Sequence, residues 1–194
     1  MLDSTPDRDL MLRFCRTQDR RAFESLVRRW DRPVLSFLAK ASGDYQGAQD
    51  MRQEVFLRVY RYGETYKPEH AFPTWLFRIA CNVLSTSRKK AARWPELSGG
   101  NSEASERMVD PAPGPREHAE RGELGADIEA MLGRLSEDER ALILLRLGLE
   151  FNYREMGEML GAPETTVKSR FYAALTRLRS TLDEQPIIER SYFK

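Results

Sequence analysis

Apolar residues recur every three or four positions along most of the chain, a spacing that places them on one face of an α-helix. Before residue 94 this spacing predicts four helices: residues 7–17, residues 20–41, a third from about residue 44 and a fourth from about residue 72 to the run SRKKAAR. Pro33 is expected to kink or break the second helix, because proline cannot donate the backbone hydrogen bond. Strand formers are scattered rather than clustered, so an all-α fold is predicted.

Helix boundaries in the second half are marked by capping motifs. SEDE at residues 136–139 and NYRE at residues 152–155 both have the spacing of a capping box, in which two side chains satisfy free amide groups at a helix start. They predict a sixth helix that ends at Gly148 and a seventh that ends before Gly161. A fifth helix is expected through Leu124 to Leu135, and an eighth from about Pro163 to residue 182.

A polar segment divides the two helical halves. Residues 94–123 are rich in Pro, Gly, Ser and acidic residues and have almost no apolar side chains to bury. Such a composition predicts a flexible linker, since burial cannot offset the entropy lost on ordering. We therefore expect two small helical domains, residues 1–93 with four helices and residues 124–185 with four more, followed by a tail at residues 186–194.

Charge is distributed unevenly, although the net charge is only +1. Residues 1–93 carry 18 Lys or Arg against 11 Asp or Glu, residues 94–123 carry 3 against 7, and residues 124–194 carry 10 against 12. A basic first domain is compatible with binding nucleic acid, which the overall charge conceals.

The sequence gives little support to a redox, metal-binding, membrane or secreted protein. Cys15 and Cys81 lie among apolar residues at helical spacing, which predicts buried, reduced thiols, although a redox pair is the alternative. His70 and His118 fit no metal-binding spacing, so neither a metal nor a cofactor is expected. No apolar run approaches the roughly 18–20 residues of a membrane span, and the acidic N-terminus lacks the features of a signal peptide. A cytoplasmic protein is therefore expected.

The last two helices have the pattern of a helix-turn-helix: about eight residues, a glycine-containing turn and a longer helix. In the eighth helix Val167, Phe171, Ala174 and Leu178 form one apolar stripe. The opposite face carries polar and aromatic side chains of the kind that contact base edges and phosphates. Taken alone, this pattern also fits a simple helical hairpin with a solvated face. The candidate DNA-binding residues are Thr165, Thr166, Lys168, Ser169, Arg170 and Tyr172.

Two further stretches give the chain a family resemblance. DYQGAQDMRQEVFLRVYRY and YKPEHAFPTWLFRIACNVLSTSRKKAAR resemble the second conserved region of bacterial RNA polymerase sigma factors. SEDERALILLRLGLEFNYREMGEMLGAPETTVKSRFYAALTRLR resembles the fourth. Roughly residues 8–182 therefore look like an extracytoplasmic-function sigma factor of the sigma-70 family. This resemblance implies a transcription initiation factor with no catalysis of its own.

The resemblance also implies contacts for the first domain. The polar face of the third helix corresponds to the surface that docks on core RNA polymerase; its candidates are Asp50, Gln53, Glu54 and Arg58. The same spacing also suits a solvated face with a Glu54–Arg58 ion pair. The fourth helix and the loop before it correspond to the part that melts the −10 element and holds an unstacked base, with Tyr66 able to stack. The −10 candidates are Tyr66, Lys67, His70, Arg78, Asn82, Arg88, Lys89 and Lys90.

Some positions depart from the family pattern. The loop YKPEHAFP differs from that of many relatives, and Ala173 and Leu175 stand where relatives often carry Arg. Loss of two phosphate contacts is expected to flatten the salt dependence of binding by about two units of slope. Family membership also implies promoter DNA and an anti-sigma factor as partners. The alternative is a conventional helix-turn-helix regulator that dimerises on duplex DNA; a recombinase would need catalytic motifs that the first domain lacks.

Overall fold

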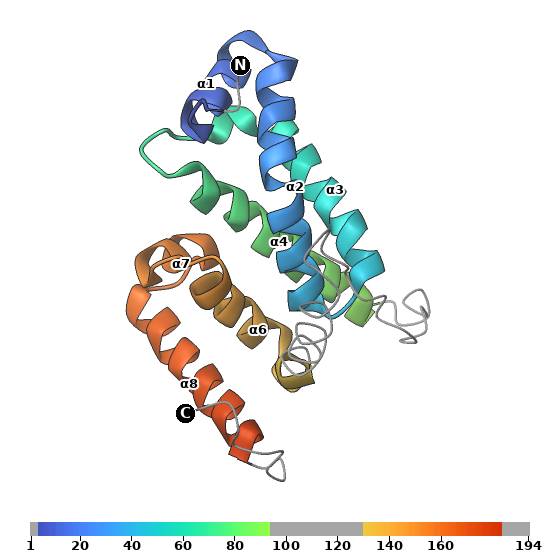
Figure 1. Ribbon diagram of the computed structural model, residues 1–194, viewed down its shortest axis with the longest axis vertical. Helices are drawn as coiled ribbons and strands as arrows, with labels where there is room; N and C mark the ends of the chain where they lie inside the picture. Colours follow the sequence, from blue (N-terminus) through green and yellow to red (C-terminus); the bar gives the residue numbers. More distant parts are fainter. Residues whose placement is uncertain (1–3, 94–129, 184–194) are drawn as a thin grey trace, which may run out of the picture.

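The computed structural model describes residues 4–93 and 130–183, and the statements that follow refer to these residues. They are helical throughout, without strands (Figure 1). The elements, in chain order, are α1 (Asp7–Thr17), α2 (Arg20–Ser42), α3 (Tyr45–Arg61), the short 3-10 helix η1 (Gly63–Thr65), α4 (Phe72–Arg93), α6 (Glu137–Ile143), the π-helix η3 (Leu144–Gly148), α7 (Tyr153–Leu160) and α8 (Glu164–Asp183). The all-α prediction is confirmed.

Most predicted helix boundaries are confirmed, and their local causes are visible. Asp19 and Asp44 accept backbone hydrogen bonds at the starts of α2 and α3. Both predicted capping boxes form, one at the start of α6 and one at the start of α7. The final helix begins at Glu164, one residue later than predicted. The predicted fifth helix lies mostly outside the described residues.

The possibility that Pro33 breaks the second helix is wrong, because α2 is one continuous helix of 23 residues. Leu26 lies before the proline and Val34 and Phe37 lie after it, and all three are buried. The apolar face on both sides of Pro33 packs in the same core, which offsets the backbone hydrogen bond that proline cannot make.

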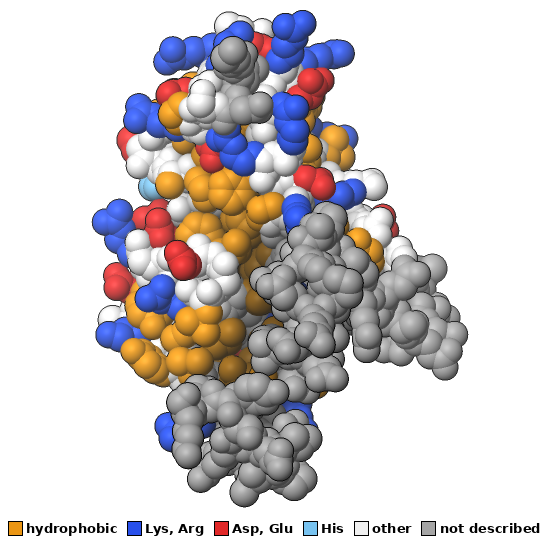
Figure 2. All heavy atoms as spheres, in the orientation of Figure 1, with side chains coloured by type: hydrophobic (Ala, Val, Ile, Leu, Met, Phe, Trp, Pro, Cys, Tyr) orange, Lys and Arg blue, Asp and Glu red, His pale blue; other side chains and the backbone are white. Residues whose placement is uncertain are grey.

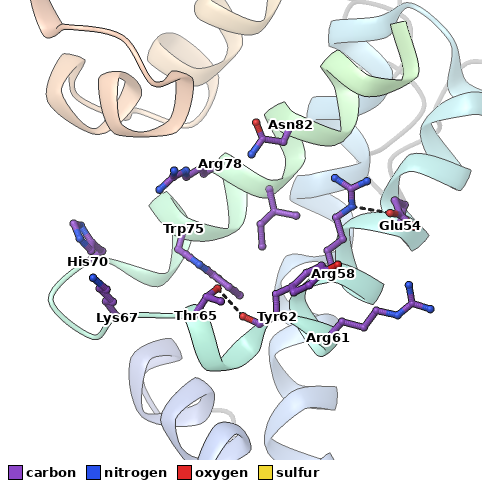
Figure 3. Close-up of a pocket in the computed structure, with 11 residues that line it drawn as sticks. Glu54, Arg58, Arg61, Tyr62, Thr65, Lys67, His70, Trp75, Arg78 and Asn82 are labelled. Carbon is purple, nitrogen blue, oxygen red and sulfur yellow. Dashed lines mark hydrogen bonds and ion pairs between the residues drawn. The ribbon is translucent and has the colours of Figure 1, made fainter. Parts of the chain in front are cut away.

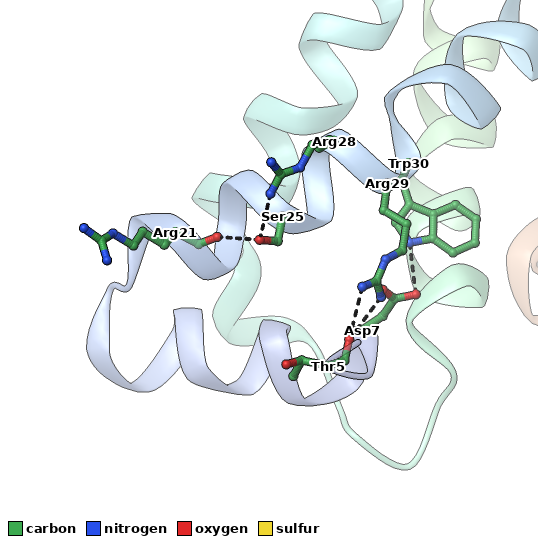
Figure 4. Close-up of polar contacts among 7 residues, drawn as sticks. All are labelled: Thr5, Asp7, Arg21, Ser25, Arg28, Arg29 and Trp30. Atoms are coloured by element: carbon green, nitrogen blue, oxygen red, sulfur yellow. Dashed lines mark hydrogen bonds and ion pairs between the residues drawn. The ribbon is translucent and has the colours of Figure 1, made fainter. Parts of the chain in front are cut away.

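Helices α1 to α4 pack around a core of apolar side chains that includes Phe14, Phe72 and Phe77. A polar cluster fastens α1 to α2 (Figure 4). Asp7 at the start of α1 accepts hydrogen bonds from Arg29 and from the indole Nε1 of Trp30, the latter at 3.0 Å. Arg29 also donates to the carbonyl oxygen of Thr5 at 3.2 Å. These bonds fix the entry of the chain into the bundle.

The helix-turn-helix is formed by α7 and α8. Gly161 ends α7 with φ of +63°, a conformation that favours glycine. The chain also passes close to Gly157, where a Cβ atom would lie 2.7 Å from the carbonyl oxygen of Ala162. The predicted inward residues Val167, Phe171 and Ala174 are buried. The motif is therefore confirmed as a packed unit, with its apolar stripe facing inward.

The C-terminal helices pack against α4 and α2. Figure 1 shows α7 and α6 between α4 and α8, and Figure 2 shows hydrophobic side chains over the middle of this face, where the two sets of helices meet. The rings of Phe77 on α4 and Phe151 before α7 lie edge to face, with centroids 5.5 Å apart. One hydrophobic core runs through both sets.

The sequence also predicted the state of the two cysteines and the absence of membrane-spanning segments. Both cysteines are free thiols; Cys81 is buried, as predicted, whereas Cys15 is only half-buried and departs from that prediction. Within the described ranges, none of the helices combines the length and the apolar character that crossing a bilayer requires.

Candidate nucleic-acid interface

A cavity of about 740 Å³ opens between α3, the loop after η1 and α4 (Figure 3). It is built by three consecutive segments of the chain, so the short connection through η1 brings its walls together. Polar and aromatic side chains dominate its lining, with Ile79 as the one aliphatic residue. The lining residues are Glu54, Arg58, Arg61, Tyr62, Thr65, Lys67, His70, Trp75, Arg78, Ile79 and Asn82.

The electrostatics of this cavity favour an anion. Arg58, Arg61, Lys67 and Arg78 contribute positive charge, and the single acid of the lining, Glu54, forms an ion pair with Arg58 at 2.6 Å between Oε1 and Nε. A cavity with excess positive charge and aromatic walls has the chemistry that binds single-stranded nucleic acid, because cations contact phosphates and rings stack on bases.

The structure gathers four of the predicted −10 residues around this cavity: Lys67 and His70 from the loop, and Arg78 and Asn82 from α4. Arg78 and Asn82 are one turn apart, so both face the same side of the helix. Arg88 and Lys89 are exposed further along α4. The side chain of Lys90 lies outside the description.

The predicted role of Tyr66, stacking on an unstacked base, has to be corrected. Its side chain is only 6% exposed, and its ring packs against Phe72 and Trp75 with centroids 6.0 and 5.5 Å away. The hydroxyl donates a hydrogen bond to the carbonyl oxygen of His70 at 3.0 Å. Burial raises the pKa of this phenol, so it remains a neutral donor at neutral pH. Tyr66 therefore fastens the loop from within rather than presenting its ring to a base.

Replacing Tyr66 by Phe is expected to loosen this loop while preserving the core, because only the hydroxyl is removed. The cost is expected to be about 0.5–1.5 kcal/mol, the value of one net hydrogen bond. Amide hydrogen exchange should become faster at Lys67 and at residues 69–71. The matched control is Tyr62→Phe, in which the altered side chain is exposed. Equal exchange in the two variants would contradict this role.

The predicted polymerase-binding residues are divided between two surfaces. Asp50 and Gln53 are exposed on α3. Glu54 and Arg58 are half-buried and form the ion pair on the cavity wall. The i,i+4 pairing that the sequence allowed is therefore confirmed, whereas the assignment of these four residues to polymerase remains a prediction.

The predicted −35 residues share one open surface of α8. Thr165, Lys168, Ser169, Arg170 and Tyr172 are exposed, and Thr166 is half-buried. Most lie within the first two turns of the helix, which are the turns that enter the major groove in this motif.

Sequence reasoning missed the aromatic part of the cavity. The ring of Trp75 on α4 is half-buried and lines the cavity together with Tyr62, and neither residue is among the predicted site residues. Tyr62, close to Arg58 and Arg61, was a signal in the sequence, since aromatic residues beside basic ones are typical of single-strand binding.

Known proteins resemble the chain over both halves. The Sigma-70 region 2 family matches residues 26–93, and the Sigma-70, region 4 family matches residues 126–178. The RNA polymerase sigma-H factor of Pseudomonas aeruginosa is 29% identical over 98% of this chain and 100% of its own length. The ECF RNA polymerase sigma-E factor of Escherichia coli K12 is 30% identical over 89% of this chain and 91% of its own length.

Solved structures support the same fold. CnrH, in complex with the cytosolic domain of CnrY, superposes with a TM-score of 0.66 over 93% of this chain and 99% of its own, at 24% identity. The sigma factor RpoE of Bartonella quintana, in complex with the anti-sigma factor NepR, gives a TM-score of 0.65 over 84% of this chain and 98% of its own, at 21% identity.

The chain belongs to the sigma-70 family of RNA polymerase sigma factors, in its extracytoplasmic-function group. Its two matched regions are the ones that the sequence resemblance indicated. The chain is accordingly a promoter-directing transcription initiation factor rather than an enzyme.

Proposed function

We propose that the cavity between α3 and α4 holds an unstacked base of the −10 element while α4 follows the phosphate backbone beside it. The observation that carries this proposal is the convergence of Arg78 and Asn82, from α4, with Lys67, from the loop, on an aromatic-walled cavity. Asn82 offers both hydrogen-bond donors and acceptors to a base edge. Trp75 and Tyr62 offer stacking surfaces, and the basic side chains attract phosphates.

The exposed face of α8 is proposed to read the duplex −35 element. Arg170 and Lys168 can pair with guanine, and the threonines can contact either a base or a phosphate. The domain assignment follows: residues 1–93 bind polymerase and the −10 element, and residues 124–185 bind the −35 element. Asp50 and Gln53 are proposed to contact core polymerase, with the Glu54–Arg58 pair at the edge of that surface.

Two further assignments rest on the relatives. The solved structures of CnrH and of Bartonella RpoE each contain a second protein, and NepR is named as an anti-sigma factor. An anti-sigma factor is therefore proposed as a regulator of this chain. The proposed location is the cytoplasm, where core polymerase acts.

The test is transcription in vitro with core RNA polymerase and a library of promoter fragments. Sequencing the RNA 5′ ends should reveal shared motifs near −35 and −10. Asn82→Ala is expected to reduce discrimination at one −10 position by about 1–3 kcal/mol, or roughly 5–150-fold, since a bidentate base contact is lost. The control is Ser87→Ala, at an exposed position on the same helix. Initiation at no fragment, or binding to palindromic duplex sites without polymerase, would contradict the proposal.

A further inference from the structure

Charge is divided unequally between two sides of the cavity that lies between α3 and α4. One side carries Lys67 and His70 from the loop and Arg78 from α4, and the other carries Glu54 and Arg58 from α3 (Figure 3). Among the described residues, neither Lys67 nor Arg78 takes part in an ion pair. On α3, Oε1 of Glu54 lies 2.6 Å from Nε of Arg58 and neutralises it. A phosphate is therefore attracted to the loop side and finds no net positive charge at the α3 pair.

The ion pair on α3 has hydrogen-bonding capacity left over. Its hydrogen bond joins Nε of Arg58 to Oε1 of Glu54. Among the described residues, the terminal amino groups of the guanidinium therefore remain as donors, and Oε2 of the carboxylate remains as an acceptor. Both side chains are accessible, since Arg58 is 30% exposed and Glu54 is 40% exposed. The pair presents a donor and an acceptor side by side to a molecule in the cavity.

The Watson–Crick edge of every base has the complementary arrangement. Adenine and cytosine present an amino group beside a ring nitrogen that accepts, whereas guanine and thymine present a ring N–H beside a carbonyl oxygen. In each case a carboxylate accepts from the N–H, and a guanidinium donates to the acceptor beside it. These edges are occupied in duplex DNA and become available only when the base is unpaired. The pair on α3 therefore matches an unpaired base without regard to its identity.

Neighbouring side chains hold a base in the orientation that this contact requires. The ring of Trp75 is half-buried, the ring of Tyr62 is 56% exposed, and both line the cavity. A base that stacks on such a ring keeps its edge free for hydrogen bonds. Because the phosphate is drawn toward Lys67 and Arg78, the edge of the base is directed across the cavity to α3.

We propose that the Glu54–Arg58 pair takes the place of the Watson–Crick partner for a base that has left the −10 duplex. Glu54 accepts a hydrogen bond from the N–H of the base, and Arg58 donates one to the acceptor beside it. The ion pair between them also keeps Arg58 from binding a phosphate. Unpairing a base costs free energy, which these hydrogen bonds offset. The inference rests on the proposed function of the cavity as a site for an unstacked −10 base.

Binding of the full chain to short single-stranded oligonucleotides tests this contact without a promoter. One probe is oligodeoxycytidine, and the other carries 2-pyrimidinone, which is cytosine without its 4-amino group, at every position. Fluorescence anisotropy at low salt, at a slightly alkaline pH that keeps cytosine unprotonated, measures the dissociation constant of each probe. The parent chain is expected to bind the cytosine probe about 10-fold more tightly, the value of one hydrogen bond to a charged group.

Glu54→Ala is expected to remove this preference, because the acceptor for the amino group is lost. The same variant should bind both probes with a steeper dependence of log affinity on log salt, by about 0.7 units of slope, because Arg58 is released to contact a phosphate. The matched control is Glu64→Ala, which removes the same charge at an exposed position of η1 outside the cavity lining and should keep the 10-fold preference. Circular dichroism confirms that the variants are folded.

Equal affinity of the parent for the two probes would overturn the inference, as would a preference that survives in Glu54→Ala or disappears in Glu64→Ala. Arg78→Ala separates this inference from the proposed function, since it removes a phosphate contact and leaves the α3 pair intact. If the cavity is not the DNA site, Arg78→Ala leaves binding of both probes unchanged. If only the contact with the base edge is wrong, Arg78→Ala weakens binding of both probes while the parent shows no preference. The absence of measurable binding to either probe overturns both proposals.

Discussion

Replacing Phe77 by Ala is expected to lower the free energy of unfolding by about 3–5 kcal/mol. The side chain is fully buried, and its ring contacts Trp30, Phe37 and Phe151, with centroids 6.1, 5.4 and 5.5 Å away. Alanine would leave a large cavity where α4 meets both α2 and the C-terminal helices. A typical domain is stable by only about 5–15 kcal/mol, so much of the population should lose its native structure near 37 °C.

Urea unfolding followed by circular dichroism measures this loss. The matched control is Leu57→Ala on α3, which removes an apolar side chain that is 41% exposed and should change stability by no more than about 0.5 kcal/mol. If Phe77→Ala lowered the free energy of unfolding by less than about 1 kcal/mol, the packing of the surrounding aromatic rings would not depend on this side chain.

Replacing Arg170 by Ala is expected to cost about 1–3 kcal/mol of binding at a single −35 base pair, or roughly 5–150-fold. Arg170 is exposed in the second turn of α8, where the helix-turn-helix places its base-reading residues. Binding of the holoenzyme to a library with a randomised −35 element provides the measurement. Discrimination at one position should disappear while preferences at the other positions persist.

Arg179→Ala is the matched control, because this residue is exposed on the same helix nine positions further along. It lies beyond the turns that enter the groove and should leave sequence preferences unchanged. If Arg170→Ala instead weakens binding to every sequence equally and reduces the slope of log affinity against log salt by about one unit, Arg170 contacts a phosphate.

The secondary structure was predictable because its causes are local. The capping boxes at Ser136 and Asn152 satisfy amides within four residues of themselves, and the stripe from Val167 to Ala174 follows the helical period. The break that Pro33 could have caused does not occur, because its cost is offset by the packing around α2, which the local sequence does not contain.

The candidate site was predictable only in outline. Motif resemblance identified Lys67, Arg78 and Asn82, but it assigned the same exposure to Tyr66, which the structure buries beneath the loop. Periodicity in the sequence cannot tell a buried loop residue such as Tyr66 from an exposed one. In a loop the direction of a side chain depends on the contacts that the loop makes with its neighbours.

The sequence by itself determined the class of protein, the starts of most helices and the apolar face of each, since all of these depend on residues a few positions apart. Only the tertiary structure decided which residues form the walls of the cavity between α3 and α4 and which acids meet Arg88. Arg88 and Asp138 are 50 positions apart in the chain, and no local spacing relates them. Their contact exists because α4 and the C-terminal helices α6 and α7 share one apolar core, and that burial determines which charged groups face one another.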